Sequence, residues 1–161
     1  MPHNPYPVLY TPEQRRRRDA SPWTLVQGLL APVQFVICII SAALVIRYLM
    51  TGEGYMAATL SVIAKTISLY TIMVTGAIWE KEVFGQYLLA PAFFWEDVVS
   101  FGVIALHTWY LLALFTGAMT PKALMILALV AYVAYVINAV QFLWKLRMAR
   151  LGASPAGEVS A

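Results

Sequence analysis

The sequence predicts an all-α integral membrane protein, a four-helix bundle with both termini in the cytoplasm. Hydrophobic residues make up 61% of the 161 residues and charged residues only 12%, and the mean hydropathy is +0.71, which is typical of membrane proteins. A helix needs roughly 20 apolar residues to cross about 30 Å of hydrocarbon. Four segments meet this requirement, because residues 20–46, 98–121 and 123–144 carry no charge and residues 54–79 carry only Lys65.

The whole chain, residues 1–161, is expected to be a single membrane domain. The predicted spans cover residues 22–49, 55–79, 93–115 and 121–145. Residues 1–20 hold prolines and a run of four arginines with little periodic apolar content, which predicts an extended cytoplasmic arm. Residues 150–161 are predicted to be a disordered tail.

A polar stripe runs along the first predicted span. Gln27, Gln34 and Ser41 recur every seven residues, so they lie within about 40° of one another on a helix. Amide side chains are costly in hydrocarbon, which predicts that this stripe faces other helices or a cavity. Ser21 and Pro22 suit the start of the span, since a serine caps free amides and a proline fits the first turn.

Two ionisable residues fall deep inside predicted spans. Lys65 lies roughly 12 to 15 Å from the start of the second span, and His107 lies roughly 16 Å deeper than Glu96 in the third. Ionisable residues inside a membrane are candidate functional residues. A snorkelling or internally paired lysine and a core histidine bonded to a hydroxyl are the alternatives that the sequence leaves open.

The acidic residues are concentrated between the second and third spans. Four of the eight are Glu80, Glu82, Glu96 and Asp97. A turn that contains Gly85 and Pro91 is expected to bring them to one membrane surface, together with Trp79 and Trp95. This surface is the predicted place of any chemistry, with simple aromatic anchoring and solvated acids as the alternative.

The distribution of basic residues predicts the orientation. Of the 11 Lys and Arg residues, eight lie on the side of the termini and the acidic turn, two (Arg47 and Lys122) lie on the other, and Lys65 lies inside. Basic residues favour the cytoplasmic side. In the fourth span Tyr135, Asn138, Gln141 and Lys145 are spaced three, three and four residues apart, and they form a polar stripe toward that same side.

The chain lacks the residue patterns of common cofactor sites. Cys38 is its one cysteine, so no disulfide framework and no cysteine-bound zinc or iron–sulfur centre is expected. It also has no glycine-rich phosphate loop. A run of arginines directly before a span indicates topology and anionic lipid more often than nucleic acid.

Several long strings resemble one known family, the 2-vinyl bacteriochlorophyllide hydratases, also described as acting on the 3-vinyl group of chlorophyllide a. The resemblance covers nearly the whole chain and departs from the family only in the short tail. The matching strings are residues 10–19, 51–55, 78–85, 90–97 and 141–145, which read YTPEQRRRRD, TGEGY, IWEKEVFG, APAFFWED and QFLWK.

The resemblance implies a small multi-pass lyase of the bacterial inner or intracytoplasmic membrane, working in bacteriochlorophyll biosynthesis for photosynthesis. It would add water to the vinyl group of a chlorophyllide and give a 1-hydroxyethyl group. The implied partners are the chlorophyllide and the lipid bilayer, without nucleic acid and without a cofactor beyond the substrate's own magnesium. Contact with other enzymes of the pathway and self-association stay open, and a non-catalytic pigment-binding or assembly protein is the alternative function. A small transporter fits least, because the acids gather at one surface.

Hydration of a vinyl group requires a proton on the terminal carbon, a stabilised cation and a base for the attacking water. No catalytic residue is established for the family, so the candidates come from the sequence: Glu96, helped by Glu80 or Asp97, for proton transfer. Glu96 and Asp97 as simple caps of the third span are the alternative. Candidate substrate-binding residues are His107 for the magnesium, Trp79 and Trp95 for the cation, Lys81 and Lys145 (with Arg18 or Arg147) for the substrate's carboxylate, and Asn138, Gln141 and Gln34.

Overall fold

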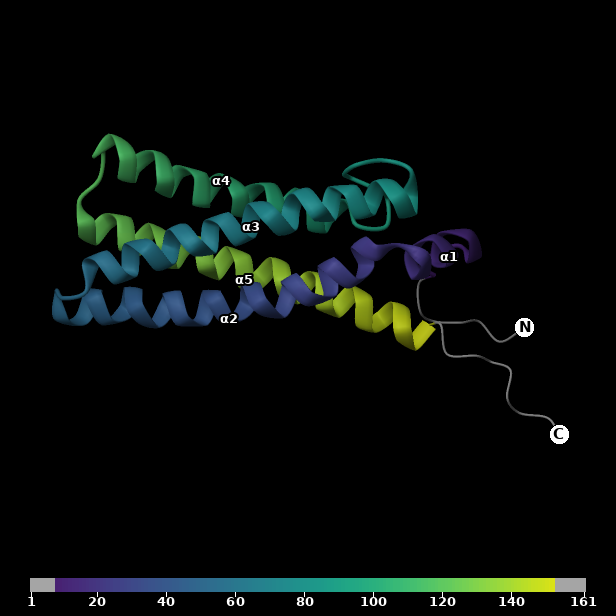
Figure 1. Ribbon diagram of the computed structural model, residues 1–161, viewed down its shortest axis with the longest axis horizontal. Coiled ribbons are helices and arrows are strands. Elements are labelled where there is room, and N and C mark those ends of the chain that lie inside the picture. Colours follow the sequence, from purple (N-terminus) through teal and green to yellow (C-terminus); the bar gives the residue numbers. More distant parts are fainter. Residues whose placement is uncertain (1–7, 153–161) are drawn as a thin grey trace.

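The computed structural model describes residues 8–152, and these form five helices (Figure 1). They are α1 (Pro12–Ala20), α2 (Pro22–Thr51), α3 (Tyr55–Phe84), α4 (Phe94–Thr116) and α5 (Pro121–Gly152). The last four are long and apolar enough to cross a membrane, so the prediction of four long apolar helices is confirmed. Each of the four ends later in the sequence than expected, and α5 ends seven residues beyond Lys145.

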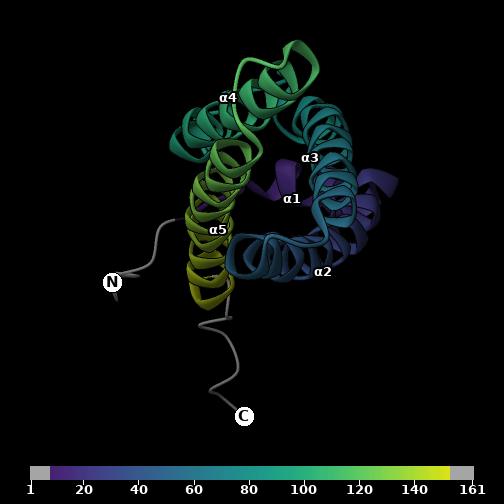
Figure 2. The ribbon, with the colours of Figure 1, turned by 90° about the vertical axis from the view of Figure 1, so that its left-hand side faces the viewer.

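The four long helices pack as a ring (Figure 2). The pairs α2–α3 and α4–α5 form antiparallel hairpins, and contacts of α2 with α5 and of α3 with α4 close the ring. Helix α1, the loop between α3 and α4 and the C-terminal end of α5 lie at the same end of the bundle (Figure 1). This arrangement brings the acidic ends of α3 and α4 next to the basic end of α5.

The prediction of an extended arm is wrong for residues 12–20, which are helical. Pro12 occupies the first turn, and Thr11 and Gln14 form a capping box in which each side chain accepts from the other's backbone N–H, at 3.2 and 2.9 Å. Glu13 pairs with Arg16 and Arg17 one turn later. These local contacts stabilise a short helix whose apolar content is low. Residues 1–7 lie outside the described part of the chain.

The predicted disordered tail also needs correction at its start. Helix α5 continues through residues 150–152 to Gly152, because Arg147 and Arg150 are good helix formers and no proline or turn signal interrupts them. The remainder of the predicted tail, residues 153–161, falls outside the described residues.

The bundle carries polar groups inside and apolar groups outside. In α2, Gln34, Cys38 and Ser41 are buried, whereas Val36 and Ile40 on the opposite side are exposed. Exposed apolar side chains around a bundle with a polar interior are what a lipid-facing surface requires. Gln27, the remaining residue of the predicted stripe, is half-buried and donates to the Thr75 hydroxyl of α3 at 2.6 Å, so the predicted inward direction of the stripe is confirmed.

Candidate active site

Three carboxyl groups are buried at the end of the bundle where α3 and α4 meet. Glu80, Glu96 and Asp97 expose only 4%, 6% and 5% of their surface. Glu82, two residues before the end of α3, is exposed and accepts a hydrogen bond from the Ser21 hydroxyl. The structure thus brings together the three acids that the sequence indicates for catalysis and leaves the fourth at the surface.

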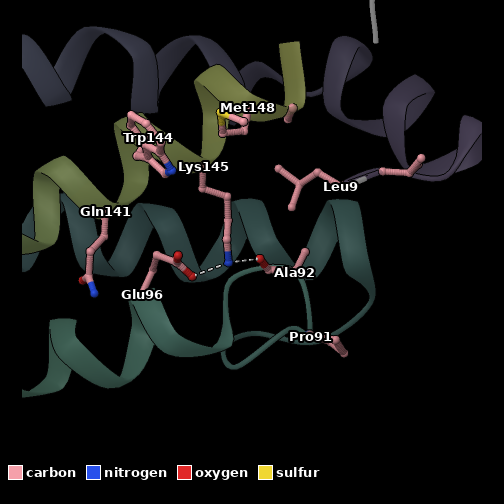
Figure 3. Close-up of a pocket in the computed structure, with 10 residues that line it drawn as sticks. Leu9, Pro91, Ala92, Glu96, Gln141, Trp144, Lys145 and Met148 are labelled. Atoms are coloured by element: carbon pink, nitrogen blue, oxygen red, sulfur yellow. Dashed lines mark hydrogen bonds and ion pairs between the residues drawn. The ribbon is translucent and has the colours of Figure 1, made fainter. Parts of the chain in front are cut away.

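Glu96 is paired with Lys145 across α4 and α5 (Figure 3). The Lys145 ammonium donates to Glu96 Oε2 at 2.6 Å and to the carbonyl oxygen of Ala92 at 2.6 Å. About two turns further in along α5, Asn138 Nδ2 donates to the backbone oxygen of Glu96 at 2.9 Å, and the Ser100 hydroxyl donates to Asn138 Oδ1 at 2.8 Å. These contacts hold Glu96 between two charged or polar side chains of α5.

The carboxyl groups of Glu80 and Asp97 interact directly with each other across α3 and α4. Neither oxygen of Glu80 has an N–H or O–H donor within reach among residues 8–152. Asp97 receives one donor, the backbone N–H of Leu89, at 2.8 Å from Oδ2. Two ionised carboxylates only accept hydrogen bonds, so a hydrogen bond between these two groups needs a proton on one of them.

The loop that joins α3 to α4 is shaped by two left-handed residues. Gly85 ends α3 at φ +86°, and Leu89 adopts φ +59°. The left-handed conformation is unusual for a leucine, and the hydrogen bond from the Leu89 N–H to Asp97 stabilises it there. Asp97 therefore connects the carboxyl pair to the conformation of this loop.

A cavity of about 460 Å³ opens beside Glu96 (Figure 3). It is lined by Val8, Leu9, Pro91, Ala92, Glu96, Gln141, Trp144, Lys145, Met148 and Ala149. Its size and its mixture of apolar walls with a few polar groups are those of a small-molecule site. Of the predicted residues, Glu96, Gln141 and Lys145 line the cavity, and Asn138 lies directly behind it through its contact with Glu96.

The segment before α1 forms part of this cavity, which the sequence did not indicate. Tyr10 is buried and stacks on Phe84 with the ring centroids 5.8 Å apart. The Arg18 guanidinium lies 4.7 Å from the centroid of the Tyr10 ring, and Arg17 donates to the Val83 backbone oxygen at 3.3 Å. Burial raises the pKa of the Tyr10 phenol. Tyr10 thus anchors the segment that carries Val8 and Leu9.

The predicted aromatic residues lie in different places. Trp79 packs edge-on against Phe84 and Phe93, with ring centroids 5.9 and 5.8 Å away, and its indole N–H donates to Thr24 at 2.9 Å. Trp95 is 68% exposed and packs against Phe94 on the outer surface. Phe93, by contrast, is buried, so it is the aromatic ring at the start of α4 that faces the bundle interior. Phe93 and Trp95 differ in this way because successive residues of a helix point in different directions.

The other predicted substrate-binding residues lie away from the cavity. Lys81 is exposed, and its ammonium donates to the Gly85 backbone oxygen at 2.9 Å. His107 and Gln34 are buried deeper in the bundle, and His107 lies close enough to Lys65 to interact with it electrostatically. His107 Nδ1 lies 2.8 Å from the backbone oxygen of Val103, and it therefore carries a proton, because a carbonyl oxygen only accepts.

Comparison with known proteins points to one family. The family model described as 2-vinyl bacteriochlorophyllide hydratase matches residues 10–148. A 2-vinyl bacteriochlorophyllide hydratase of Cereibacter sphaeroides is 70% identical over 151 residues, which cover 93% of each chain. One of Rhodobacter capsulatus is 68% identical over 154 residues, 95% of this chain and 90% of the relative.

No solved structure matches the chain. The matched region nevertheless contains α1, the four long helices up to residue 148, the three buried carboxyl groups and Lys145. With a family model over most of its length and relatives near 70% identity, the chain belongs to the 2-vinyl bacteriochlorophyllide hydratase family.

Proposed function

We propose that the protein is a hydro-lyase that adds water to the vinyl group of a bacteriochlorophyllide or chlorophyllide and gives a 1-hydroxyethyl group. Both relatives carry the name 2-vinyl bacteriochlorophyllide hydratase. The observation that carries the proposal to this chain is the cluster of three buried carboxyl groups beside a ligand-sized cavity. Hydration changes no net oxidation state, so neither a redox nor a nucleotide cofactor takes part.

The substrate's own carboxylate binds at Lys145. A chlorophyllide has a free propionate in place of a long-chain ester, and Lys145 lines the cavity with its side chain 29% exposed. A substrate carboxylate at this ammonium replaces Glu96 as its partner. The apolar walls of the cavity, which include Trp144 and Met148, then cover the face of the macrocycle.

Glu96 transfers protons to and from the substrate, because it is the one carboxyl group of the three that lines the cavity. Glu80 and Asp97 face each other, no other side chain among residues 8–152 donates to them, and the two carboxyl groups hold one proton between them. This proton passes to Glu96 when the substrate occupies Lys145. Protonated Glu96 gives the proton to the terminal vinyl carbon, and the positive charge forms on the carbon next to the ring.

Water then bonds through its oxygen to this cationic carbon. Ionised Glu96 takes the proton that the water loses, so the carboxyl cluster ends the cycle with the proton with which it started. The rings of Phe93 and Trp79 lie on the inner side of this end of the bundle. They exclude bulk water and offer π faces to the transient cation.

Magnesium ligation by His107 requires a different position of the ring. His107 lies roughly 16 Å further along α4 than Glu96, since 11 residues separate them. This distance exceeds that between the central magnesium and a vinyl group of one chlorin. A ring whose vinyl group lies at Glu96 therefore does not place its magnesium at His107.

The proposal is tested by incubating the purified protein in detergent with chlorophyllide a. Conversion removes a conjugated double bond, so the red absorption band is expected to shift to shorter wavelength, and mass analysis should find the gain of one water. Protein-free detergent serves as the control. A bound chlorophyllide of unchanged mass would instead support a pigment-binding or assembly protein.

Lys145→Met is expected to weaken substrate binding by about 10- to 100-fold, which is the value of one charge-assisted hydrogen bond. The chlorophyllide methyl ester provides the matched test, because it lacks the carboxylate. The wild-type protein should bind the ester more weakly than the acid, and Lys145→Met should bind both equally. A variant that still prefers the acid would assign carboxylate binding to another residue.

The end of the bundle that carries the carboxyl cluster faces the cytoplasm of the inner or intracytoplasmic membrane, as the eight-to-two distribution of basic residues favours. Reporter fusions at residue 85 and after residue 152 are expected to report a cytoplasmic position, and a fusion at residue 53 a periplasmic one. A periplasmic signal at residue 85 would reverse the orientation.

A further inference from the structure

Buried polar side chains continue from the carboxyl cluster into the middle of the bundle. Tyr132, Tyr135 and Asn138 occupy one face of α5 at intervals of three residues. Asn138 binds the backbone of Glu96, and the ring of Tyr135 lies 3.6 Å from the Lys65 ammonium. We call this series of buried polar residues, from Asn138 through Tyr135 and Lys65 to Tyr132 and its neighbours, the polar column.

The inner end of the polar column involves all four long helices. The Tyr132 hydroxyl lies 2.5 Å from the Ser41 hydroxyl, which lies 2.7 Å from that of Ser61. The ring of His107 lies 5.9 Å from the ring of Tyr132. The column therefore extends over several helical turns, through a region where the outer surface of the bundle is apolar.

Three buried polar atoms of the bundle interior, one each from α2, α3 and α4, lack a hydrogen-bond partner within the described chain. They are Gln34 Nε2, Lys65 Nζ and His107 Nε2. Their residues expose 2%, 0% and 1% of their surface, and buried polar groups are normally satisfied by protein or by ordered water. Three such buried atoms on three helices indicate a polar ligand in the bundle interior.

We propose that this ligand is water, and that the polar column delivers the water that adds to the vinyl group. An ammonium and an amide nitrogen need acceptors, whereas Nε2 of a neutral His107 needs a donor, because Nδ1 carries the proton of the ring. Water serves all three groups, but an anion cannot donate to His107. The second part of the proposal rests on the proposed function.

The position of the column explains why the reaction would use it. A chlorin in the cavity covers Glu96 on the side of Trp144 and Met148. The column reaches Glu96 from the interior of the bundle through Asn138 and Ser100. Water from this side meets the substrate at Glu96, the residue that takes its proton in the proposed mechanism.

Cys38 is the one cysteine of the chain. Labelling of its thiol therefore measures whether this interior is hydrated, without any substitution. Cys38 is buried next to Lys65. A small water-soluble methanethiosulfonate reacts with a hydrated thiolate, forming a mixed disulfide and releasing methanesulfinate. In protein embedded in membranes, the proposal predicts that Cys38 is labelled even though it lies far from both ends of α2.

The matched control moves the thiol by one residue, in the variant Cys38→Ser/Ile39→Cys. Residue 39 is exposed on the outside of the bundle, where lipid surrounds it. Faster labelling of Cys38 than of this control supports a hydrated column. A rate at Cys38 equal to or below that of the control would overturn the proposal, and since no substrate is involved, it would leave the hydratase function untouched.

A second measurement tests delivery of water to the reaction. The group attached to Cys38 obstructs the column, so labelled protein is expected to lose turnover while its affinity for chlorophyllide stays the same. Cys38→Ser treated with the reagent should keep the turnover of its own untreated sample. Full turnover after complete labelling would exclude a role in the reaction, and loss of chlorophyllide binding would show that the column holds substrate rather than water.

Discussion

Replacing Glu96 by glutamine is expected to reduce turnover by about 10²- to 10⁴-fold, the usual contribution of a general acid or base. The amide is similar in shape, and its oxygen still accepts from Lys145, which donates to Glu96 at 2.6 Å. Folding and chlorophyllide binding should therefore be preserved. Turnover and pigment affinity are measured on the same preparation, so that a loss of rate is separated from a loss of protein.

Glu82→Gln is the matched control for this change. Glu82 is an exposed acid at the same end of the bundle and contacts the Ser21 hydroxyl rather than the cavity. Its replacement should change turnover little. If Glu96 served only to stabilise the start of α4, Glu96→Gln would lower stability without a specific loss of rate, and that result would remove Glu96 from the mechanism.

Breaking the carboxyl pair is expected to reduce turnover by a similar factor, through either Glu80→Gln or Asp97→Asn. An amide at one position still donates to the remaining carboxylate, so the contact between α3 and α4 is kept while the shared proton is lost. The Leu89 N–H also keeps an oxygen to bind at residue 97, where it donates to Oδ2 at 2.8 Å. Turnover should fall at unchanged chlorophyllide affinity.

Asp19→Asn is the control for Asp97→Asn, because Asp19 is an exposed acid paired with Arg18 near the same end. Asp97→Leu distinguishes the structural role, since it removes the acceptor for Leu89 and should lower stability as well as rate. If Glu80→Gln, Asp97→Asn and Glu96→Gln each retained more than about a tenth of wild-type turnover, the carboxylate mechanism would be wrong. Lys65, His107 and the tyrosines of α5 would then be the next candidates.

Much of the fold could be predicted because segments that cross a membrane contain few charged residues. The four long helices and the inward direction of Gln34 and Ser41 follow from charge-free segments and from the cost of amides in hydrocarbon. The concentration of acids at one end also follows, because the turn between α3 and α4 is short. Helix α1 was missed, since its stability comes from the capping box of Thr11 and Gln14 rather than from apolar periodicity.

The site could be predicted in its composition but only partly in its pairing. The sequence places Glu80, Glu96 and Asp97 near one another, yet which acid faces which depends on how α3, α4 and α5 are rotated about their axes. The structure pairs Glu80 with Asp97 and Glu96 with Lys145. The rotation of α4 about its axis also turns Trp95 outward and Phe93 inward. The periodicity of residues within a single helix does not determine this rotation.

The cavity wall formed by Val8 and Leu9 could not be predicted either. These residues lie before α1 and reach the cavity because Tyr10 stacks on Phe84, more than 70 positions later in the chain. A proline-rich segment without apolar periodicity gives no signal for such a contact. Tyr10 next to a run of arginines was the one available indication, since aromatic rings attract guanidinium groups.

The central claim is that Glu96 transfers a solvent-derived proton to the terminal vinyl carbon. The most direct test follows wild-type protein and Glu96→Gln, each saturated with chlorophyllide in deuterated buffer, by mass analysis of the pigment over time. The wild-type product should carry the added water and one deuterium bound to the new methyl carbon, while the pigment bound to Glu96→Gln should keep its vinyl group without deuterium. Formation of the same labelled product by Glu96→Gln at the wild-type rate would contradict the claim.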